Sequence, residues 1–143
     1  MKLLDAVSYI DIQDIEEITD YLKNMEYQIY SINGCKLVTI EDIFLWIKNE
    51  LPQDPPLSGK VNFDALVDSL WGGFDELDEE KVAILWSNPK ETINKDKTRY
   101  ETLIDCFEEI AKTLTMKEYG IEKPISLKTV LLDKGKLYSR FGK

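Results

Sequence analysis

The segment KVAILW, at residues 81–86, is the feature that most constrains the fold of this chain. A continuous apolar run of this kind is typical of a strand that is buried on both faces of a sheet. Further strand-like segments at residues 3–12, 27–34 and 126–133 alternate with helix-like segments along the chain. This alternation predicts an α/β fold, in which a small parallel sheet is packed with helices through right-handed crossovers.

A first helix is indicated by apolar residues that recur at helical spacing soon after the first strand, and Asp11 is expected to cap it. Strand and helix together predict an N-terminal β-α unit over residues 1–26. So few residues cannot bury a core alone, so we interpret this unit as an extension of the same domain that adds one strand to the sheet. The apolar face of the helix consists of Ile15, Ile18, Leu22 and Met25.

The second helix has a clear start and a clear end. Thr39, with Asp42 three residues later, forms a capping-box pattern. The segment LPQDPPL, at residues 51–57, ends the helix because three prolines in so short a stretch cannot stay helical. The apolar face between these points consists of Ile40, Ile43, Phe44, Ile47 and Leu51.

A last helix is predicted after the strand KVAILW. The polar segment NPKETINKDK, at residues 88–97, is expected to be a loop, and Thr98 with Glu101 forms a second capping-box pattern. The helix is expected to reach about residue 116. Its apolar face consists of Tyr100, Leu103, Ile104, Phe107, Ala111 and Leu114.

The charge of the chain narrows the possible partners. It carries 27 acidic and 18 basic residues, a net charge of −9. This balance disfavours nucleic acid and anionic membrane surfaces, which attract Lys and Arg, and suits a basic protein partner. The alternative is that the charge serves solubility alone.

The cysteines and the apolar runs indicate a cytoplasmic protein. Asp5 and Asp11 interrupt any hydrophobic leader, and no apolar run approaches the length of a membrane span. Cys35 and Cys106 are the only cysteines, a number typical of reduced cytoplasmic thiols. A disulfide between the two is the alternative.

The chain contains no histidine, which disfavours enzymes and metal proteins. Histidine is the commonest general base and the commonest metal ligand, so Ser-His-Asp sites, Cys-His sites and the familiar zinc sites are excluded within this chain. No glycine-rich phosphate loop occurs either. Carboxylates alone could still hold Mg²⁺ or serve as an acid–base pair, but we expect no enzyme, no cofactor and no metal.

The segment NFDALVDSLWGG predicts a short amphipathic helix that Asn62 caps and that Gly72 and Gly73 end. Asp64 and Asp68 lie one turn apart at the edge of its apolar face. A like-charge pair at this spacing costs a few tenths of a kcal/mol, about the size of one surface ion pair. A pair kept at this cost indicates binding to a basic group, and two solvated acids are the alternative.

The acidic run DELDEE, at residues 75–80, follows this helix. We expect it to form a solvated loop before the next strand. Its functional interpretation is a second acidic patch that steers a basic partner, an effect that salt would screen.

The segment NFDALVDSLWG resembles the signature helix of the barstar family, the intracellular inhibitors of secreted bacterial ribonucleases. The resemblance continues upstream in SINGCKLVTIEDIFLWIKNEL and downstream in VAILW, LIDCFEEIAK and ISLKTVLLD, in the same order and at similar spacing. It covers roughly residues 27–133, which we interpret as a barstar-like domain, followed by a basic tail at residues 134–143. The resemblance implies a small α/β domain with a parallel sheet.

The resemblance also implies how the protein binds. Members of the family block the active site of a ribonuclease with an acidic helix and the loop before it. The inhibitory acids carry over onto Asp64 and Asp68, with Glu109 on the later helix as an outer contact. Carboxylates can occupy the phosphate position of such a site and accept hydrogen bonds from its basic groups. The aromatic common within the helix is Val67 here, and Trp71 is either an interface anchor or a cap over the core.

The loop before the helix departs from the family pattern. It reads LSGKVNF, so Ser58, Gly59 and Lys60 stand where members often carry an aromatic. We include Ser58, Gly59 and the capping Asn62 among the expected partner contacts. The resulting hypothesis is a ribonuclease inhibitor that serves as an immunity protein or antitoxin. The alternative is a barstar-like interaction module whose basic partner is not a nuclease.

Overall fold

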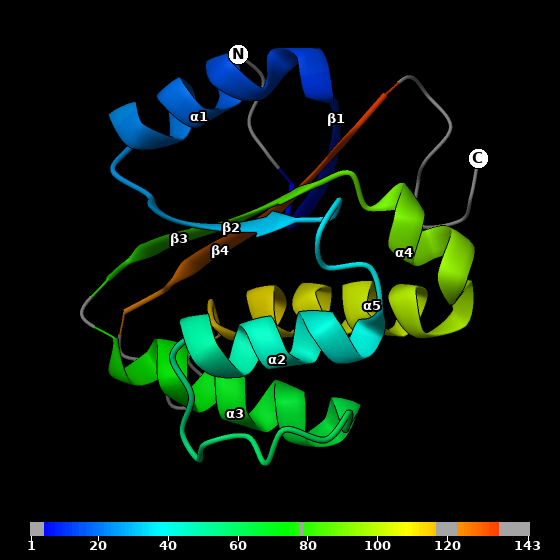
Figure 1. Cartoon of the computed structure of the whole chain (residues 1–143). Helices are drawn as coiled ribbons and strands as arrows, with labels where there is room; N and C mark the ends of the chain where they lie inside the picture. Colours follow the sequence, from blue (N-terminus) through cyan, green and yellow to red (C-terminus); the bar gives the residue numbers. More distant parts are fainter. Residues whose placement is uncertain (1–4, 78, 117–122, 135–143) are drawn as a thin grey trace.

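The computed structural model describes residues 5–77, 79–116 and 123–134. A four-stranded sheet lies at its centre (Figure 1), and it is formed by β1 (Val7–Asp11), β2 (Gln28–Asn33), β3 (Lys81–Ser87) and β4 (Ser126–Asp133). The strands run in the order β1-β4-β3-β2, and every neighbouring pair is parallel. The inner part of β3, residues 82–86, is buried throughout. The predicted α/β fold with a small parallel sheet is therefore confirmed.

Helices cover both faces of the sheet (Figure 1). The chain crosses the sheet in one direction from β1 to β2 and returns in the other direction through β3 to β4. Crossovers of one hand therefore place the first connection on the opposite face from the later two. On one face lies α1 (Ile15–Asn24), and on the other lie α2 (Ile40–Glu50), α3 (Phe63–Glu76) and α5 (Lys97–Thr113).

Each face of the sheet has its own core. The larger core lies on the side of α2, α3 and α5, and its bulkiest members are Phe44, Phe74, Trp86 and Phe107. The smaller core lies under α1, where the fully buried Ile18 and Leu22 meet side chains of β3 and β4. The sheet residues of this second core are Ala83, Leu85, Val130 and Leu132.

The N-terminal unit joins the sheet as the sequence predicts. β1 pairs with β4 in the register Val7↔Thr129 and forms one edge of the sheet. Asp11 accepts a hydrogen bond from the Gln13 backbone N–H and so caps a short 3-10 helix, η1 (Ile12–Asp14), that leads into α1. Met25, the last residue of the predicted apolar face, is 40% exposed beyond the end of α1. The division of the chain at residue 27 and the tail at 134–143 stay predictions, and the tail beyond Lys134 lies outside the described residues.

The capping box of α2 is confirmed. The Thr39 hydroxyl accepts from the Asp42 backbone N–H at 3.0 Å, and the Asp42 carboxylate accepts from the Thr39 N–H at 3.4 Å. The helix ends at Glu50, directly before the proline-rich segment. All five residues of its predicted apolar face are buried.

The prediction that Gly72 and Gly73 end the acidic helix was wrong, because α3 continues to Glu76. The close approach of a neighbouring backbone segment explains both glycines. A Cβ built on Gly72 would lie 2.2 Å from the Asp54 carbonyl oxygen, and one on Gly73 would lie 2.2 Å from the Pro52 carbonyl. The α2–α3 link therefore passes directly against the helix, and only residues without a side chain allow this approach.

Two predictions about the segment after β3 were also wrong. The expected loop at 88–97 contains a short helix, α4 (Lys90–Lys95). Thr98 does not cap the last helix: α5 begins at Lys97, and Asp96 is its cap, accepting from the Arg99 N–H at 3.1 Å. The side-chain hydrogen bond from Arg99 also lowers the pKa of Asp96. The last residue of α5 is Thr113, so the helix ends before the expected end at about residue 116.

The acidic run at 75–80 is only in part the expected loop. Asp75 and Glu76 are the last residues of α3, and Glu79 and Glu80 are exposed before β3. A helix long and apolar enough to cross a membrane does not occur among the described residues.

Candidate functional site

The amino-terminal half of α3 presents its acids to solvent. The Asn62 side chain accepts a hydrogen bond from the Ala65 N–H at 3.0 Å and so fixes the start of the helix. Leu66 and Leu70 are fully buried in the larger core, which orients the helix. Asp64 and Asp68 are consequently exposed, and neither forms a hydrogen bond or an ion pair with any residue that the structure describes.

A hollow of about 370 Å³ lies between α3 and α5, which pack against each other. Asp68 and Trp71 line it from α3, and Glu109 lines it from α5, so three of the predicted partner contacts are brought together. Trp71 is half-buried, packs against the larger core and lines the hollow, and its role as an interface anchor stays a prediction. The remaining lining comes from Val67 and Thr113.

Burial and two acids of this surface, Glu109 and Asp64, raise the pKa of a thiol. Cys106 is on α5 and is 8% exposed. Burial, followed by the charges of Glu109 and Asp64, raises the pKa of Cys106 to about 11. Asp64 on α3 and Glu109 on α5 therefore both act on the same thiol between the two helices.

The loop contacts predicted from the resemblance lie apart from this hollow. Ser58, Gly59 and Asn62 do not line it. Gly59 has a positive φ of 98°, and the Ser58 hydroxyl accepts a hydrogen bond from the Lys60 N–H at 3.4 Å. A Cβ built on Gly59 would lie 3.5 Å from the Lys48 ammonium nitrogen. Lys48 of α2 therefore lies beside the loop that carries Lys60, and sequence reasoning identified only Lys60.

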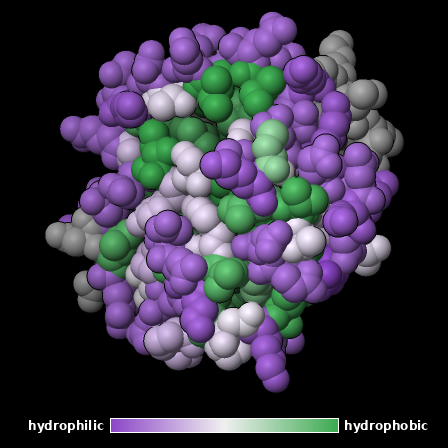
Figure 2. Space-filling model, viewed as in Figure 1, coloured by the Kyte–Doolittle hydropathy of each residue, from purple (hydrophilic) through white to green (hydrophobic). Residues whose placement is uncertain are grey.

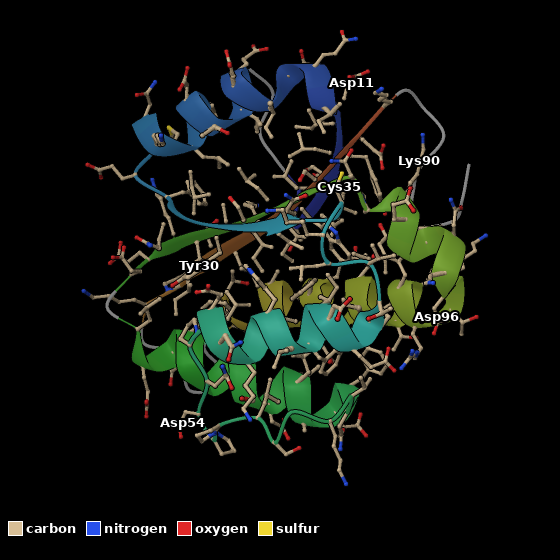
Figure 3. The ribbon with its side chains drawn as sticks, viewed as in Figure 1. Asp11, Tyr30, Cys35, Asp54, Lys90 and Asp96 are labelled. Atoms are coloured by element: carbon tan, nitrogen blue, oxygen red, sulfur yellow. The ribbon has the colours of Figure 1, made fainter. Side chains whose placement is uncertain are left out.

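A second part of the same link, which carries the Asp54 labelled in Figure 3, is fixed to α3 by polar contacts. The Asp54 N–H donates to the Ser69 carbonyl at 2.9 Å, and the Ser69 hydroxyl donates to the Pro55 carbonyl. A side-chain hydrogen bond with Asp54, followed by the charge of Asp54, raises the pKa of Glu76. No sequence pattern pointed to this carboxyl pair, since its members are far apart along the chain.

The sequence analysis did not identify Thr113, which also lines the hollow. Thr113 is one helical turn after Glu109, so helical spacing could have found it once Glu109 was chosen.

The arrangement does not offer an obvious metal site. Among the described residues, no group of three or more Cys, Asp or Glu side chains is placed to hold a metal ion. Asp64 and Asp68 are aligned along one helix and do not face each other across a cleft.

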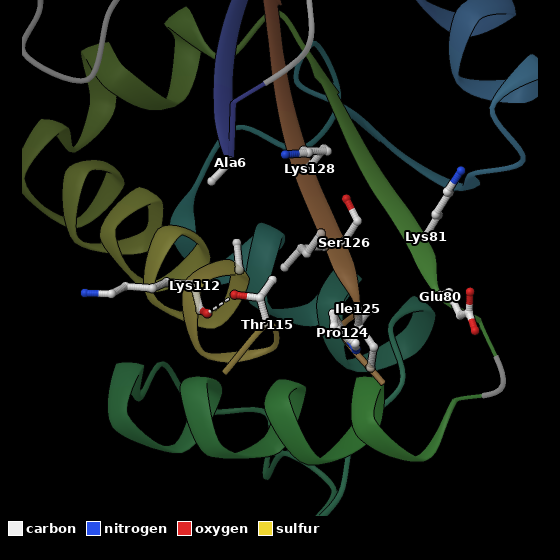
Figure 4. A pocket seen from close by; sticks show the side chains of 11 residues that line it. Ala6, Glu80, Lys81, Lys112, Thr115, Pro124, Ile125, Ser126 and Lys128 are labelled. Carbon is white, nitrogen blue, oxygen red and sulfur yellow. Dashed lines mark hydrogen bonds between the residues drawn. The ribbon is translucent and has the colours of Figure 1, made fainter. Parts of the chain in front are cut away.

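Another hollow, of about 310 Å³, lies where β3 and β4 begin, beside the end of α5 (Figure 4). Three lysines line it, but Figure 4 shows that Lys81, Lys112 and Lys128 point in different directions. They therefore do not converge on one anion, and this hollow is a weaker candidate than the one between α3 and α5.

A family model described as "Barstar (barnase inhibitor)" matches residues 27–127, from just before β2 to the beginning of β4. No curated protein matches the chain closely enough to count as a relative. The family match covers more than half of the chain, including the acidic helix and the hollow between α3 and α5. On this basis the chain belongs to the Barstar family, and it is a ribonuclease-inhibitor-like protein with one β-α unit ahead of the matched region.

Proposed function

We propose that this protein binds a basic ribonuclease and blocks its active site with the acidic surface formed by Asp64, Asp68 and Glu109. The observation that carries the proposal is the state of Asp64 and Asp68, which are exposed on a rigid helix and unpaired within the described chain. The charges of these groups are available to a partner without the loss of any internal ion pair. A ribonuclease active site is a cationic groove shaped for phosphate, so carboxylates in this position replace the RNA backbone.

The hollow supports the same proposal. The half-buried side chains of Trp71 and Val67 line it together with the carboxylates of Asp68 and Glu109. Aromatic anchors surrounded by charged groups are common at the centre of tight interfaces. We propose Trp71 as this anchor, and Ser58, Gly59 and Asn62 as outer contacts on the loop side.

The biological role that fits this chemistry is an immunity protein or antitoxin. Such a protein acts in the cytoplasm of the cell that makes the ribonuclease. Both cysteines are free thiols, as expected in a reducing compartment.

One observation favours a different partner. Lys48 and Lys60 lie on the loop side of the acidic helix, and a basic groove would repel them. The second candidate function is therefore a Barstar-family interaction module whose basic partner is not a nuclease. Capture of the partner by the tagged protein separates the two candidates, because the captured protein either degrades RNA or does not.

Inhibition of barnase, the ribonuclease named in the family description, is the direct test. Asp68→Ala should weaken inhibition by about 2–5 kcal/mol, a range established partly on the barnase–barstar complex itself. The melting temperature should change little, because Asp68 is exposed and forms no ion pair with a described residue. Glu17→Ala on α1 is the matched control, since it removes the same charge from the opposite face of the sheet.

Three outcomes would count against the proposal. Full inhibition by the double variant Asp64→Ala, Asp68→Ala would place the binding surface elsewhere. Equal losses for Asp68→Ala and Glu17→Ala would mean that net charge alone acts. Absence of inhibition by the unmodified protein, with a captured partner that leaves RNA intact, would favour the second candidate function.

A further inference from the structure

Two lysines beside the acidic helix are the feature that the proposed function leaves unexplained. Lys48 lies in the last turn of α2, and Lys60 lies in the link that leads into α3. Both side chains are exposed. Figure 2, in the view of Figure 1, shows the surface over α2 and this link, where hydrophilic residues interrupt apolar and neutral ones. Positive charge therefore stands close to the acids at the start of α3.

The backbone around Lys60 is held on both sides. Before it, Leu57 is buried in the larger core, and its N–H donates to the side-chain oxygen of Gln53 at 3.0 Å. After it, the Asn62 side chain accepts from the Ala65 N–H and starts α3. The backbone of Lys60 is thus fixed relative to the helix. A partner that docks on α3 therefore meets this charge at a defined place.

Gly59 gives the second lysine its position beside the link. The residue has a positive φ of 98°, and a Cβ built on it would lie 3.5 Å from the Lys48 ammonium nitrogen and 3.9 Å from the Lys48 Cδ. The Lys48 side chain therefore passes across Gly59, the residue directly before Lys60. Two cations from different elements consequently reach the same short stretch of chain.

The charges of both signs around the start of α3 are unpaired. Neither Lys48 nor Lys60 forms an ion pair with a residue that the structure describes. Lys60 precedes Asp64 by only four positions, but no ion pair joins the two side chains. Asp64 and Asp68 are likewise exposed and unpaired within the described chain. Positive and negative groups are therefore both available to the same partner.

This mixed surface defines the charge that a partner must carry. Like charges brought together in an interface oppose binding, whereas opposite charges steer the encounter and fix the orientation. Specific interfaces use both effects, since a group that repels a wrong partner can pair with the right one. The partner that fits is therefore basic where it meets Asp64 and Asp68, and acidic where it meets Lys48 and Lys60.

We propose that Lys48 and Lys60 set the specificity of this protein by pairing with carboxylates that the partner carries at the rim of its basic groove. This inference rests on the proposed function, because it takes the acidic surface on α3 as the place where the groove docks. A ribonuclease with an acidic rim is compatible with both lysines, so they do not require a partner of another class.

The test measures the affinity of charge variants for barnase, or for the captured partner if the protein does not inhibit barnase. Lys48→Glu and Lys60→Glu should each raise the dissociation constant by about tenfold, because an attractive pair becomes repulsive. A partner that is basic throughout would instead bind both variants more tightly. Lys23→Glu is the matched control, since it makes the same change of net charge at an exposed position of α1, on the opposite face of the sheet.

The sign of the change decides the outcome. Unchanged or tighter binding of Lys48→Glu and Lys60→Glu would overturn the proposal, and so would a loss that Lys23→Glu shares in full. Melting temperatures close to that of the unmodified protein would show that the variants keep the fold. The neutral variants Lys48→Gln and Lys60→Gln should show a smaller loss of affinity in the same direction.

Asp68→Ala in the same assay separates this inference from the proposed function. If Asp68→Ala weakens binding and the variants of Lys48 and Lys60 do not, only the present inference fails. If the lysine variants weaken binding and Asp68→Ala does not, the proposed acidic surface fails.

Cross-linking of the complex identifies the pairs directly. A carbodiimide joins a lysine amine to a carboxylate in contact with it, and mass spectrometry of the linked peptides shows which residues are joined. Lys48 or Lys60 should be linked to an Asp or Glu of the partner. A complex in which other lysine–carboxylate links form, but none from Lys48 or Lys60, would overturn the proposal.

Discussion

Replacement of Gly73 by alanine tests whether the link between α2 and α3 is as tightly packed as the structure indicates. Helix propensity alone predicts that Gly73→Ala stabilises the protein by about 1 kcal/mol, since Gly73 is inside α3. The new methyl group would lie 2.2 Å from the Pro52 carbonyl and 2.4 Å from the Gln53 nitrogen, whereas ordinary contacts begin at 3.4 Å. These neighbours are backbone atoms, so the link must move away from the helix.

The contacts that depend on this link set the magnitude. Movement would strain the two hydrogen bonds between Ser69 and the link, to the Asp54 N–H and the Pro55 carbonyl. It would also disturb Gln53, whose amide donates to the Lys48 carbonyl at 2.7 Å at the end of α2. With about 1 kcal/mol for each hydrogen bond lost and about 1–3 kcal/mol for overpacking, the cost exceeds the propensity gain, and the net loss is about 2–4 kcal/mol.

Urea denaturation followed by fluorescence measures this loss directly, and thermal melting should show a fall of roughly 5–10 °C. Ala65→Gly is the control, because Ala65 is exposed on the same helix and reports the propensity term alone, a loss of about 1 kcal/mol. A Gly73→Ala variant that is as stable as the unmodified protein, or more stable, would refute the reasoning about close packing.

Three further predictions follow from burial and charge. Leu22→Ala should lower the free energy of unfolding by about 2–5 kcal/mol in urea, because Leu22 is fully buried under α1; a loss below about 1 kcal/mol would contradict the packing of α1 on the sheet. The hydrogen bond with Asp54 raises the pKa of Glu76, so the folded state favours the protonated form; this stabilisation is present below the ordinary value of 4.5 and is lost as the pH rises through the raised pKa. Glu76→Gln should therefore raise the melting temperature at pH 7 and not at pH 4, and an equal effect at both would count against the pair. A thiol reagent at pH 8 should modify the exposed Cys35 quickly and Cys106 only slowly, since burial raises the pKa of Cys106 to about 11; fast modification of both thiols by mass spectrometry would show that α5 opens.

Where the sequence predicted structure well, the signal was local. The capping box at Thr39 and Asp42 and the stop before the prolines depend on residues within one turn of each other, and both were confirmed. The apolar run of β3 needed burial on both faces, which only a central strand of a covered sheet supplies.

The errors came from interactions between distant segments. Gly72 and Gly73 have the local pattern of a helix end, but the link at Pro52 to Asp54 requires them in the middle of α3. Thr98 has the local pattern of a cap, but Asp96 is the cap. Asp96 also accepts a hydrogen bond from the Arg99 side chain, and Arg99 in turn contacts Glu41 on α2.

At the candidate site, helical spacing alone was enough to place Asp64 and Asp68 on one face of a helix, with Leu66 and Leu70 on the buried face. That Glu109 and Thr113 line a hollow with Asp68, and that Lys48 lies beside the loop, depends on how distant segments pack. The physical reason is that helical spacing fixes neighbours within a helix, whereas the packing of α3 against α5 is set by the shape of a core to which every element contributes.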